Sequence, residues 1–295
     1  MSEENDPDTP SCCASCGIAE IDEIKLKECG DCDLVRYCSD ECQQEHKSKH
    51  EEACQKRAAE LRDEILFMQP ECSHLGDCPI CCLPLPLVGK SKYPVYSCCC
   101  KMICKGCVYA NQKRETEGKL QQVCPFCRHP LPKSKEEEVR NIRKRVEAND
   151  PVAICYTGVM HRNEGDYNKA LEYLIRSAEL GCISAHFYLH DTVKNEEERI
   201  YHLEEAAIGG HADARHNLGC VEASNGSHGR ALKHFIIAAN LGHDGSLANL
   251  KEAYKCGLVR KEVLASALRA HHASVVATKS PQRVQAEKNH VKQLS

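Results

Sequence analysis

The sequence predicts two kinds of fold in one chain: small metal-stabilised α+β fingers in the N-terminal part and an all-α solenoid of helix pairs in the C-terminal part. The first observation is the placement of cysteine, since 19 of the 23 cysteines lie at or before position 127. The second is a segment that recurs three times after residue 149, at offsets of 29 and 32 residues. Short segments with few large apolar residues need metal ions or disulfides to stabilise them. Repeats of this length are typical of stacked helix pairs.

The clustered cysteines are expected to bind zinc and not to form disulfides. The start of the chain, MSEENDPDTPSCC, lacks the apolar core of a signal peptide, and no stretch approaches 18 apolar residues. We therefore expect an intracellular reducing compartment, cytoplasm or nucleus, and no membrane association. Clustered cysteines there are metal ligands. The net charge is −4 with neutral thiols, and fifteen thiolates holding four Zn²⁺ make it more negative. This acidity disfavours nucleic acid as a partner.

The order of compositions along the chain predicts its domains. Ala58, Leu61, Ile65 and Met68 follow helical spacing up to Pro70, which ends that helix. The run KSKEEEVRNIRKRVEAND is a charged helix or linker. The expected segments are a disordered acidic leader (1–11), a first finger (12–54), a helical spacer (55–71), a second finger (72–132), a charged helical linker (133–148), a repeat solenoid (149–258), and C-terminal capping helices with a tail (259–295).

Four pairs of metal-binding side chains make up the first finger. They are Cys13-x2-Cys16, Cys29-x2-Cys32, Cys38-x3-Cys42 and His50-x3-Cys54. A Cys-x2-Cys pair places two thiolates on one ion, and an x3 spacing puts two ligands one helical turn apart. Cys12 is an alternative to Cys13, but only Cys13 has the x2 spacing to Cys16.

This array, with the run Tyr37-Cys38-Ser39-x-x-Cys42-Gln43, resembles a MYND finger. The resemblance implies that the pairs interleave. One zinc would bind Cys13, Cys16, Cys38 and Cys42, and a second would bind Cys29, Cys32, His50 and Cys54. It also implies binding of short proline-containing peptides from partner proteins, with Gln43 in the peptide groove.

The second finger is similar to a RING finger. Its cysteines are Cys78-x2-Cys81, the triplet Cys98-Cys99-Cys100, Cys104-x2-Cys107 and Cys124-x2-Cys127. The resemblance implies one zinc on Cys78, Cys81, Cys104 and Cys107, and another on Cys124 and Cys127 with two ligands from the triplet. Cys99 stands at the third ligand position, and the remaining donor is Cys98 or Cys100; our predicted set takes Cys98. Cys72 and Cys82 are expected to be spare thiols.

By the same resemblance, the second finger could bind a ubiquitin-conjugating enzyme. The contact surface would use Ile80 between the first two ligands, Pro125 between the last two, and Arg128 just after them. A zinc ion with four protein ligands has no open position for chemistry, so such a ligase acts by positioning its partner.

The repeated segments are SAELGCISAHFYL (177–189), AAIGGHADARHNL (206–218) and AANLGHDGSLANL (238–250). Each contains a glycine suited to a left-handed helix end, namely Gly181, Gly210 or Gly242. With Asp166-Tyr167-x-Lys169-Ala170 and Asn217-Leu218-Gly219, the pattern resembles Sel-one-like repeats, a tetratricopeptide-related family. The segment after 259 is expected to form one or two helices that cap the stack, with a break at Ser280-Pro281.

Two functional classes follow from these patterns. The first is a zinc-binding adaptor in which the fingers and the solenoid bind proteins, the partner of the solenoid being unidentified. The second is a RING-type ubiquitin-protein ligase, and transfer of ubiquitin with purified conjugating enzymes separates the two. The sequence contains no other catalytic signature, and the adaptor is our main prediction because both classes include it.

Overall fold

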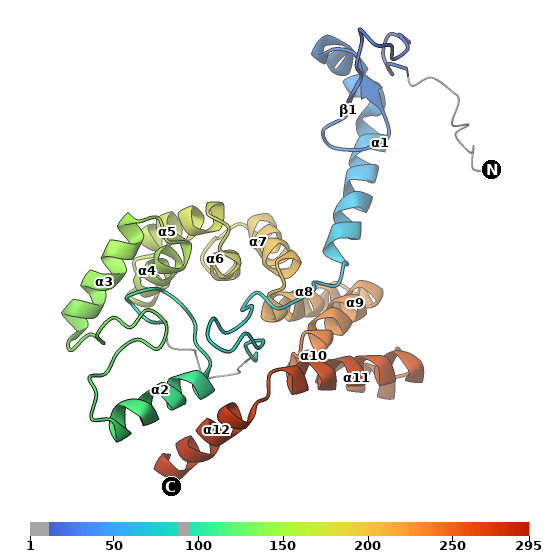
Figure 1. Cartoon of the computed structure of the whole chain (residues 1–295). Helices are drawn as coiled ribbons and strands as arrows, with labels where there is room; N and C mark the ends of the chain where they lie inside the picture. The colour runs from blue at the N-terminus through green and yellow to red at the C-terminus, as the bar shows by residue number, and fades with distance from the viewer. Residues whose placement is uncertain (1–11, 88–94, 295) are drawn as a thin grey trace. The chain divides into compact units, whose positions relative to one another are not determined.

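The computed structural model describes residues 12–87 and 95–294, so the predicted leader (1–11) lies outside the described residues. The chain forms two compact units, residues 1–68 and 69–295, and each is described by itself. Figure 1 gives the labels of the helices and strands.

The first unit consists of a two-stranded sheet and one long helix. Strands β1 (Lys27–Glu28) and β2 (Arg36–Tyr37) are antiparallel, with Lys27 opposite Tyr37. Helix α1 (Asp40–Leu66) begins after Ser39, whose hydroxyl accepts a hydrogen bond from the backbone N–H of Cys42. The helix expected from residue 55 is therefore the second half of a helix that begins at Asp40. The finger and the spacer share this one rigid element.

The second unit begins with the second finger, where short β-bridges surround helix α2 (Lys105–Glu117). A series of helices follows. They are α3 (Lys135–Glu147), α4 (Pro151–Asn163), α5 (Tyr167–Glu179), α6 (Ile183–Leu189), α7 (Glu196–Ile208), α8 (Ala212–Ser224), α9 (His228–Asn240), α10 (Asp244–Lys255), α11 (Lys261–Ala277) and α12 (Pro281–Leu294). From α3 to α10 each helix packs on the next, which is the predicted solenoid (Figure 1).

The sequence repeat corresponds to a structural repeat. Each repeated segment contains the end of one helix, a turn, and the start of the next (α5–α6, α7–α8 and α9–α10). Gly181, Gly210 and Gly242 have positive φ angles of 83°, 83° and 98°, which confirms the predicted left-handed helix ends. The aligned residues Ala185, Ala214 and Ser246 are fully buried, so small side chains stand where helices approach closely.

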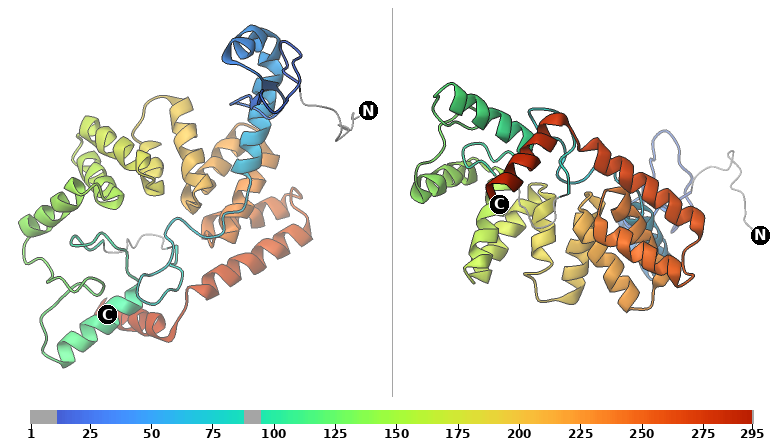
Figure 2. Two further views of the ribbon diagram at one scale, coloured as in Figure 1. Left: turned by 45° about the horizontal axis from the view of Figure 1, so that its top comes forward. Right: turned by 90° about the horizontal axis from the view of Figure 1, so that it is seen from below.

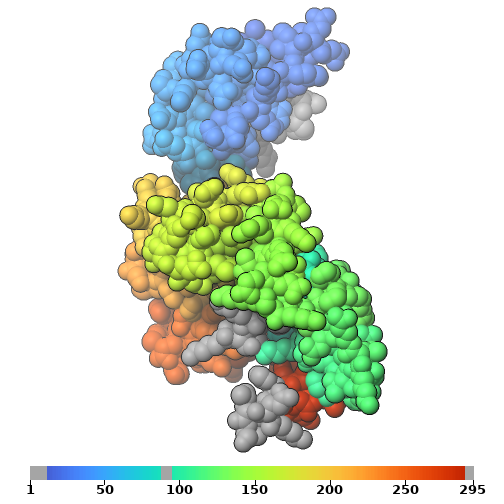
Figure 3. All heavy atoms as spheres, turned by 90° about the vertical axis from the view of Figure 1, so that its left-hand side faces the viewer, coloured from blue at the N-terminus to red at the C-terminus, as the bar shows by residue number. Residues whose placement is uncertain are grey.

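The helices at the two ends of the series make further contacts. Helix α3 lies in the segment predicted as a charged helical linker, and it packs on α4, with Ile142 buried against Ala153. Helix α11 packs on α9 and α10, at the end of the series. Helix α12, however, packs on α2 of the second finger, and both views of Figure 2 show these helices side by side. The space-filling view shows the red C-terminal atoms adjoining the green atoms of this finger (Figure 3).

Across the described parts of the chain, none of the helices is both long enough and apolar enough to cross a membrane.

Candidate metal centres

Four clusters of cysteine and histidine side chains lie in the fingers. Within each cluster the four possible ligand atoms lie within 4.8 Å of one another. The clusters are Cys13, Cys16, Cys38 and Cys42; Cys29, Cys32, His50 and Cys54; Cys78, Cys81, Cys104 and Cys107; and Cys98, Cys99, Cys124 and Cys127. In both fingers the first ligand pair joins the third and the second joins the fourth, which is the interleaved order that the two resemblances imply.

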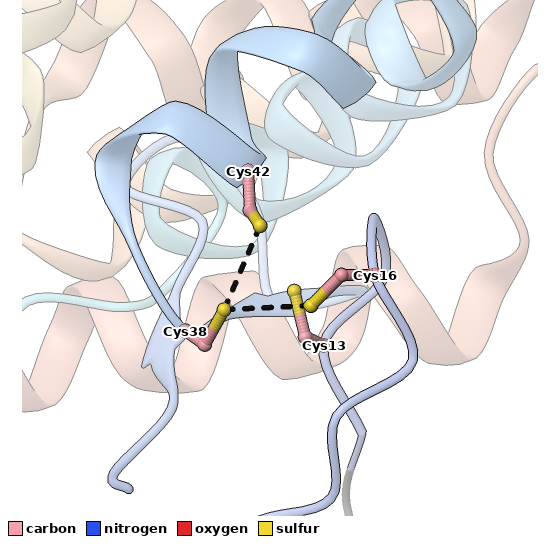
Figure 4. A group of neighbouring side chains, drawn as sticks. All are labelled: Cys13, Cys16, Cys38 and Cys42. Carbon is pink, nitrogen blue, oxygen red and sulfur yellow. Dashed lines mark hydrogen bonds between the residues drawn. The ribbon is translucent and has the colours of Figure 1, made fainter.

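The first cluster has the dimensions of a zinc site. The Cys16 and Cys38 sulfurs are 3.5 Å apart, and those of Cys38 and Cys42 are 3.6 Å apart. A tetrahedron with zinc–sulfur bonds of about 2.3 Å has edges of about 3.8 Å. The loop before β1 carries Cys13 and Cys16, Cys38 follows β2, and Cys42 lies in the first turn of α1, with all four sulfurs pointing toward a common centre (Figure 4).

Helix α1 supplies two donors to the second cluster. His50 and Cys54 are one turn apart on this helix, and His50 is buried. Its Nε2 lies 3.2 Å from the sulfur of Cys32, and the sulfurs of Cys29 and Cys54 are 3.7 Å apart. The first finger therefore combines two loop pairs, the pair Cys38 and Cys42 at the start of α1, and one pair within α1, and this helix supplies ligands to both clusters.

The second finger repeats this design with cysteine alone. In the third cluster the sulfurs of Cys81 and Cys104 are 3.7 Å apart. In the fourth, Cys99 and Cys124 are 3.7 Å apart, and Cys98 and Cys127 are 3.3 Å apart. Cys104 is the N-cap of α2 and Cys107 lies in its first turn, so this helix holds two donors of the third cluster.

Cys100 lies apart from the fourth cluster. It has a left-handed backbone (φ 52°) and is buried beside Ile142 and Ala153. Burial raises the pKa of its thiol to about 11, so it stays protonated. Of the two alternatives that the triplet left open, the structure places Cys98 in the cluster. Cys12, the alternative to Cys13, and the predicted spare thiols Cys72 and Cys82 are exposed and outside the clusters.

In the first cluster, ionisation of all the thiols together depends on a compensating cation. Burial opposes ionisation of Cys13, but backbone N–H groups of Cys16, Cys38 and Ser15 lower its pKa to about 6. Its neighbour Cys38 has a pKa raised to about 12 by hydrogen bonding with Cys16 and Cys42. Four thiolates this close cannot all be charged without a metal ion. Zinc fits this donor set of sulfur and imidazole nitrogen.

The residues predicted to contact partners have different surroundings. Gln43 is exposed on α1, and the side chain of Ile80 is 41% exposed. Pro125 is buried. The Arg128 guanidinium donates to Oδ1 of Asn111 at 2.8 Å, so this side chain already has a partner inside the finger.

Two sets of side chains that contact the ligand segments of the second finger were not predicted from the sequence. Asn111 and Glu115 on α2 are buried and bind the backbone of Val123, just before the last ligand pair. Arg283 on α12 is buried and donates to the sulfur of Cys81 at 3.3 Å. Neither lies at a ligand spacing, so no local sequence signal marks them.

Comparison with known proteins identifies the class of the first finger. Residues 13–54 match the family model of the MYND finger. Together with the Cys and His clusters, this match indicates that the chain is a zinc-binding protein. The match covers the first finger alone, and no curated protein is significantly similar to the chain.

Some solved structures share part of the helical arrangement. A Sel1 repeat protein from Oxalobacter formigenes has a TM-score of 0.43 and 19% identity, and the match covers 64% of this chain and 88% of that one. Two structures of MamA have TM-scores of 0.32, with 19% and 18% identity. Their matches cover 62% and 64% of this chain, and 96% and 94% of theirs. Likeness at this level says nothing about what the chain binds.

Proposed function

We propose that the chain is a zinc-dependent adaptor that holds other proteins through its fingers and its helical repeats. The observation that carries the proposal is the closed donor set of each cluster, which offers four ligands to one ion. Zinc with four protein ligands is structural, because it has no position left for water or substrate. Four such ions stabilise surfaces and perform no reaction themselves.

The proposed ligands are the sixteen clustered side chains. They are Cys13, Cys16, Cys29, Cys32, Cys38, Cys42, His50 and Cys54 in the first finger, and Cys78, Cys81, Cys98, Cys99, Cys104, Cys107, Cys124 and Cys127 in the second. The fingers have small cores made largely of these residues, so metal binding contributes directly to their folding.

The surface composition supports protein partners. The first finger exposes Ile18, Ile21 and Leu34, and the solenoid exposes Tyr167 and Tyr201. Aromatic and apolar side chains are enriched in the centres of protein interfaces. We assign proline-containing peptides to the first finger, in keeping with its MYND match, with Gln43 as a contact residue.

A peptide-binding experiment tests the adaptor function. A library of short proline-containing peptides is titrated against the full zinc-loaded chain by fluorescence polarisation. Gln43→Ala should weaken the best peptide about tenfold or more, the loss of one interface contact of about 1.4 kcal/mol. The matched control is Gln44→Ala, which changes the next exposed glutamine of α1. Equal affinity of both variants, or no peptide bound, would count against this assignment.

A ubiquitin-protein ligase is the second candidate. The interleaved clusters of the second finger and the exposed Ile80 between Cys78 and Cys81 favour it. Pro125 is buried, whereas Arg128 is exposed and hydrogen-bonded to Asn111, so this candidate depends first on Ile80 and then on the exposed part of Arg128.

Ubiquitin transfer with a panel of purified conjugating enzymes tests the second candidate. If the chain is a ligase, Ile80→Ala should reduce transfer roughly thirtyfold while all zinc is retained, as expected for an interface anchor of about 2 kcal/mol. Leu120→Ala is the matched control, because Leu120 is also exposed but lies beyond α2. If the wild-type chain transfers no ubiquitin with any enzyme of the panel, the ligase candidate is rejected and the adaptor remains as the proposed function.

A further inference from the structure

The C-terminal helix α12 is joined to the second finger by one buried arginine. Arg283 is 6% exposed, although it carries a charged guanidinium. Its Nη1 donates to the carbonyl oxygen of Pro84 at 2.6 Å, and its Nη2 donates to that of Leu83 at 3.0 Å. Nη1 also donates to the carbonyl of Thr278, which precedes α12. The side chain therefore bridges the start of α12 and the loop that follows Cys81.

The same guanidinium reaches a ligand of the third cluster. Nη2 lies 3.3 Å from the sulfur of Cys81, with the geometry of an N–H···S hydrogen bond. Among the described residues no carboxylate forms an ion pair with Arg283, and its other acceptors are neutral carbonyls. A buried cation requires a compensating negative charge. The nearest source of negative charge is the cluster of Cys78, Cys81, Cys104 and Cys107.

Zinc binding provides this charge. One Zn²⁺ with four thiolates has a net charge of −2, so each sulfur becomes a stronger hydrogen-bond acceptor than a neutral thiol. A guanidinium beside such a centre reduces its charge, and outer partners of this kind raise metal affinity. The benefit is mutual, because the charged centre also stabilises the buried arginine.

The backbone of α2 is shaped for this contact. Gly106 lies in the first turn of α2, between the ligands Cys104 and Cys107. A Cβ added at Gly106 would lie 2.8 Å from Cγ and 2.9 Å from the backbone nitrogen of Arg283. A side chain at this position would hold α12 away from the cluster, and glycine allows the close approach.

We propose that Arg283 is the outer-sphere partner of the metal centre formed by Cys78, Cys81, Cys104 and Cys107, and that it couples metal binding at this centre to docking of α12 on α2. The proposal rests on the proposed zinc site. Arg283 is a positioning residue: it binds a ligand of the metal and not the metal itself. With the metal bound, α12 is held on the finger, and loss of the metal leaves the guanidinium buried without a compensating charge.

Substitution of Arg283 in the full zinc-loaded chain tests the first half of the proposal. Zinc release to a chromophoric chelator is followed, and thiol alkylation identifies the cysteines that are released. Arg283→Gln should weaken one of the four zinc sites about tenfold to a hundredfold, with Cys78 and Cys107 becoming reactive first. Arg283→Lys should recover part of the loss by restoring the charge. Arg269→Gln, which changes an exposed arginine of α11, should leave all sites unchanged.

Spectroscopy separates this role from simple packing. With Co²⁺ in place of zinc, loss of the hydrogen bond to Cys81 should shift the sulfur-to-cobalt charge-transfer band in Arg283→Gln and not in Arg269→Gln. Amide exchange of residues 282–289 should accelerate in Arg283→Gln, and also in the wild-type chain when chelator empties the third cluster. Exchange in α8 should stay unchanged.

Three outcomes would overturn the inference. If Arg283→Gln binds zinc as tightly as the wild-type chain and its cobalt charge-transfer band does not shift, Arg283 only packs against the finger and is no partner of the metal centre. Continued protection of 282–289 after the cluster is emptied would remove the coupling. Rapid alkylation of Cys78 in the native wild-type chain would show that the cluster holds no metal, and this result overturns the proposed zinc site together with the inference.

Discussion

The imidazole ring of His74 stacks on that of His211, with ring centroids 3.8 Å apart. The backbone N–H of His74 also donates to the carbonyl of Gly210 at 3.1 Å. Residues 72–74 lie so close to the turn between α7 and α8 that a Cβ on Gly210 would be 2.5 Å from the carbonyl oxygen of Cys72. The entry to the second finger is thus attached to the middle of the solenoid.

The histidine stack predicts a loss of stability in acid. Burial lowers the pKa of His74 to about 4 and that of His211 well below its ordinary value, although Asp213 faces both rings and His190 and His243 lie near His211. Below about pH 6.5 the unfolded chain gains protons that the folded chain does not bind, so stability falls until about pH 4. For His74 alone the loss is about 3 kcal/mol at the acid end. The contribution of these two histidines to stability is fully present above about pH 6.5.

The change His74→Phe tests this origin. The variant keeps an aromatic ring on His211 but cannot bind a proton, so its melting temperature should fall less between pH 7 and pH 5 than that of the wild-type chain. Acid also releases zinc from thiolates, and this release is common to both proteins. The control is His272→Phe at an exposed position of α11. Equal pH dependence of His74→Phe and the wild-type chain would contradict the prediction.

The zinc content should distinguish Cys98 from Cys100. We expect four zinc ions per chain by elemental analysis of protein purified without chelator. Cys98→Ser should lower the value to about three, because a serine hydroxyl is a poor replacement for a thiolate ligand. Cys100→Ser should retain four ions, because this thiol is buried beside Ile142 and not in the cluster. The reverse pattern would mean that the triplet supplies a different ligand.

Removal of metal by a chelator should speed amide exchange in α1 and leave it slow in helices α4–α10. Cys42, His50 and Cys54 all lie on α1, so removal of metal should increase amide exchange in residues 40–54. Helices α4–α10 should keep their slow exchange, because their core consists of apolar side chains such as Leu174, Leu189 and Leu250. Hydrogen exchange with and without chelator measures both regions in one experiment. Rapid exchange throughout the solenoid would show that its stability depends on the metal centres.

Replacing each of two solenoid glycines by alanine should change the free energy of unfolding in opposite directions. A Cβ on Gly219 in α8 would lie 2.5 Å from Cε1 of Phe235, so Gly219→Ala should cost about 1–3 kcal/mol. Gly229 in α9 has open space, and Gly229→Ala should gain up to about 1 kcal/mol because alanine favours helix. Urea unfolding followed by circular dichroism compares the two variants. A destabilised Gly229→Ala would mean that this backbone needs glycine.

Much of the architecture follows from short-range patterns. A Cys-x2-Cys pair must turn its two thiols toward one point, so pairs such as Cys13 and Cys16 were predictable from spacing alone. The aligned Leu189, Leu218 and Leu250 are all buried, because the same helix-turn-helix unit recurs at each. These features depend on the spacing of residues that are close in sequence, and this spacing can be seen in the sequence itself.

Other features depend on contacts that no local pattern encodes. The attachment of α12 joins Arg283 to Leu83, 200 positions earlier, and the sequence around residue 283 resembles that of any polar helix. Pro125 and Arg128 were predicted as contact residues from their place beside ligands. In the folded finger Pro125 is buried, whereas Arg128 is exposed and donates to Asn111 on α2. Which side of a loop faces solvent depends on the neighbouring helix, and spacing does not specify it.

The docking of α12 on α2 also has a consequence for biosynthesis. The residues of the second finger leave the ribosome long before Arg283, and the whole solenoid must be translated in between. During translation the four cysteines of the cluster around Cys81 are complete while the helix that packs on the finger does not yet exist. The contact between Leu83 and Arg283 closes a loop of 200 positions, which is slow compared with formation of a local turn. Completion of the finger is therefore a late event, and a ribosome that stops before residue 283 would release a chain whose second finger lacks its final helix.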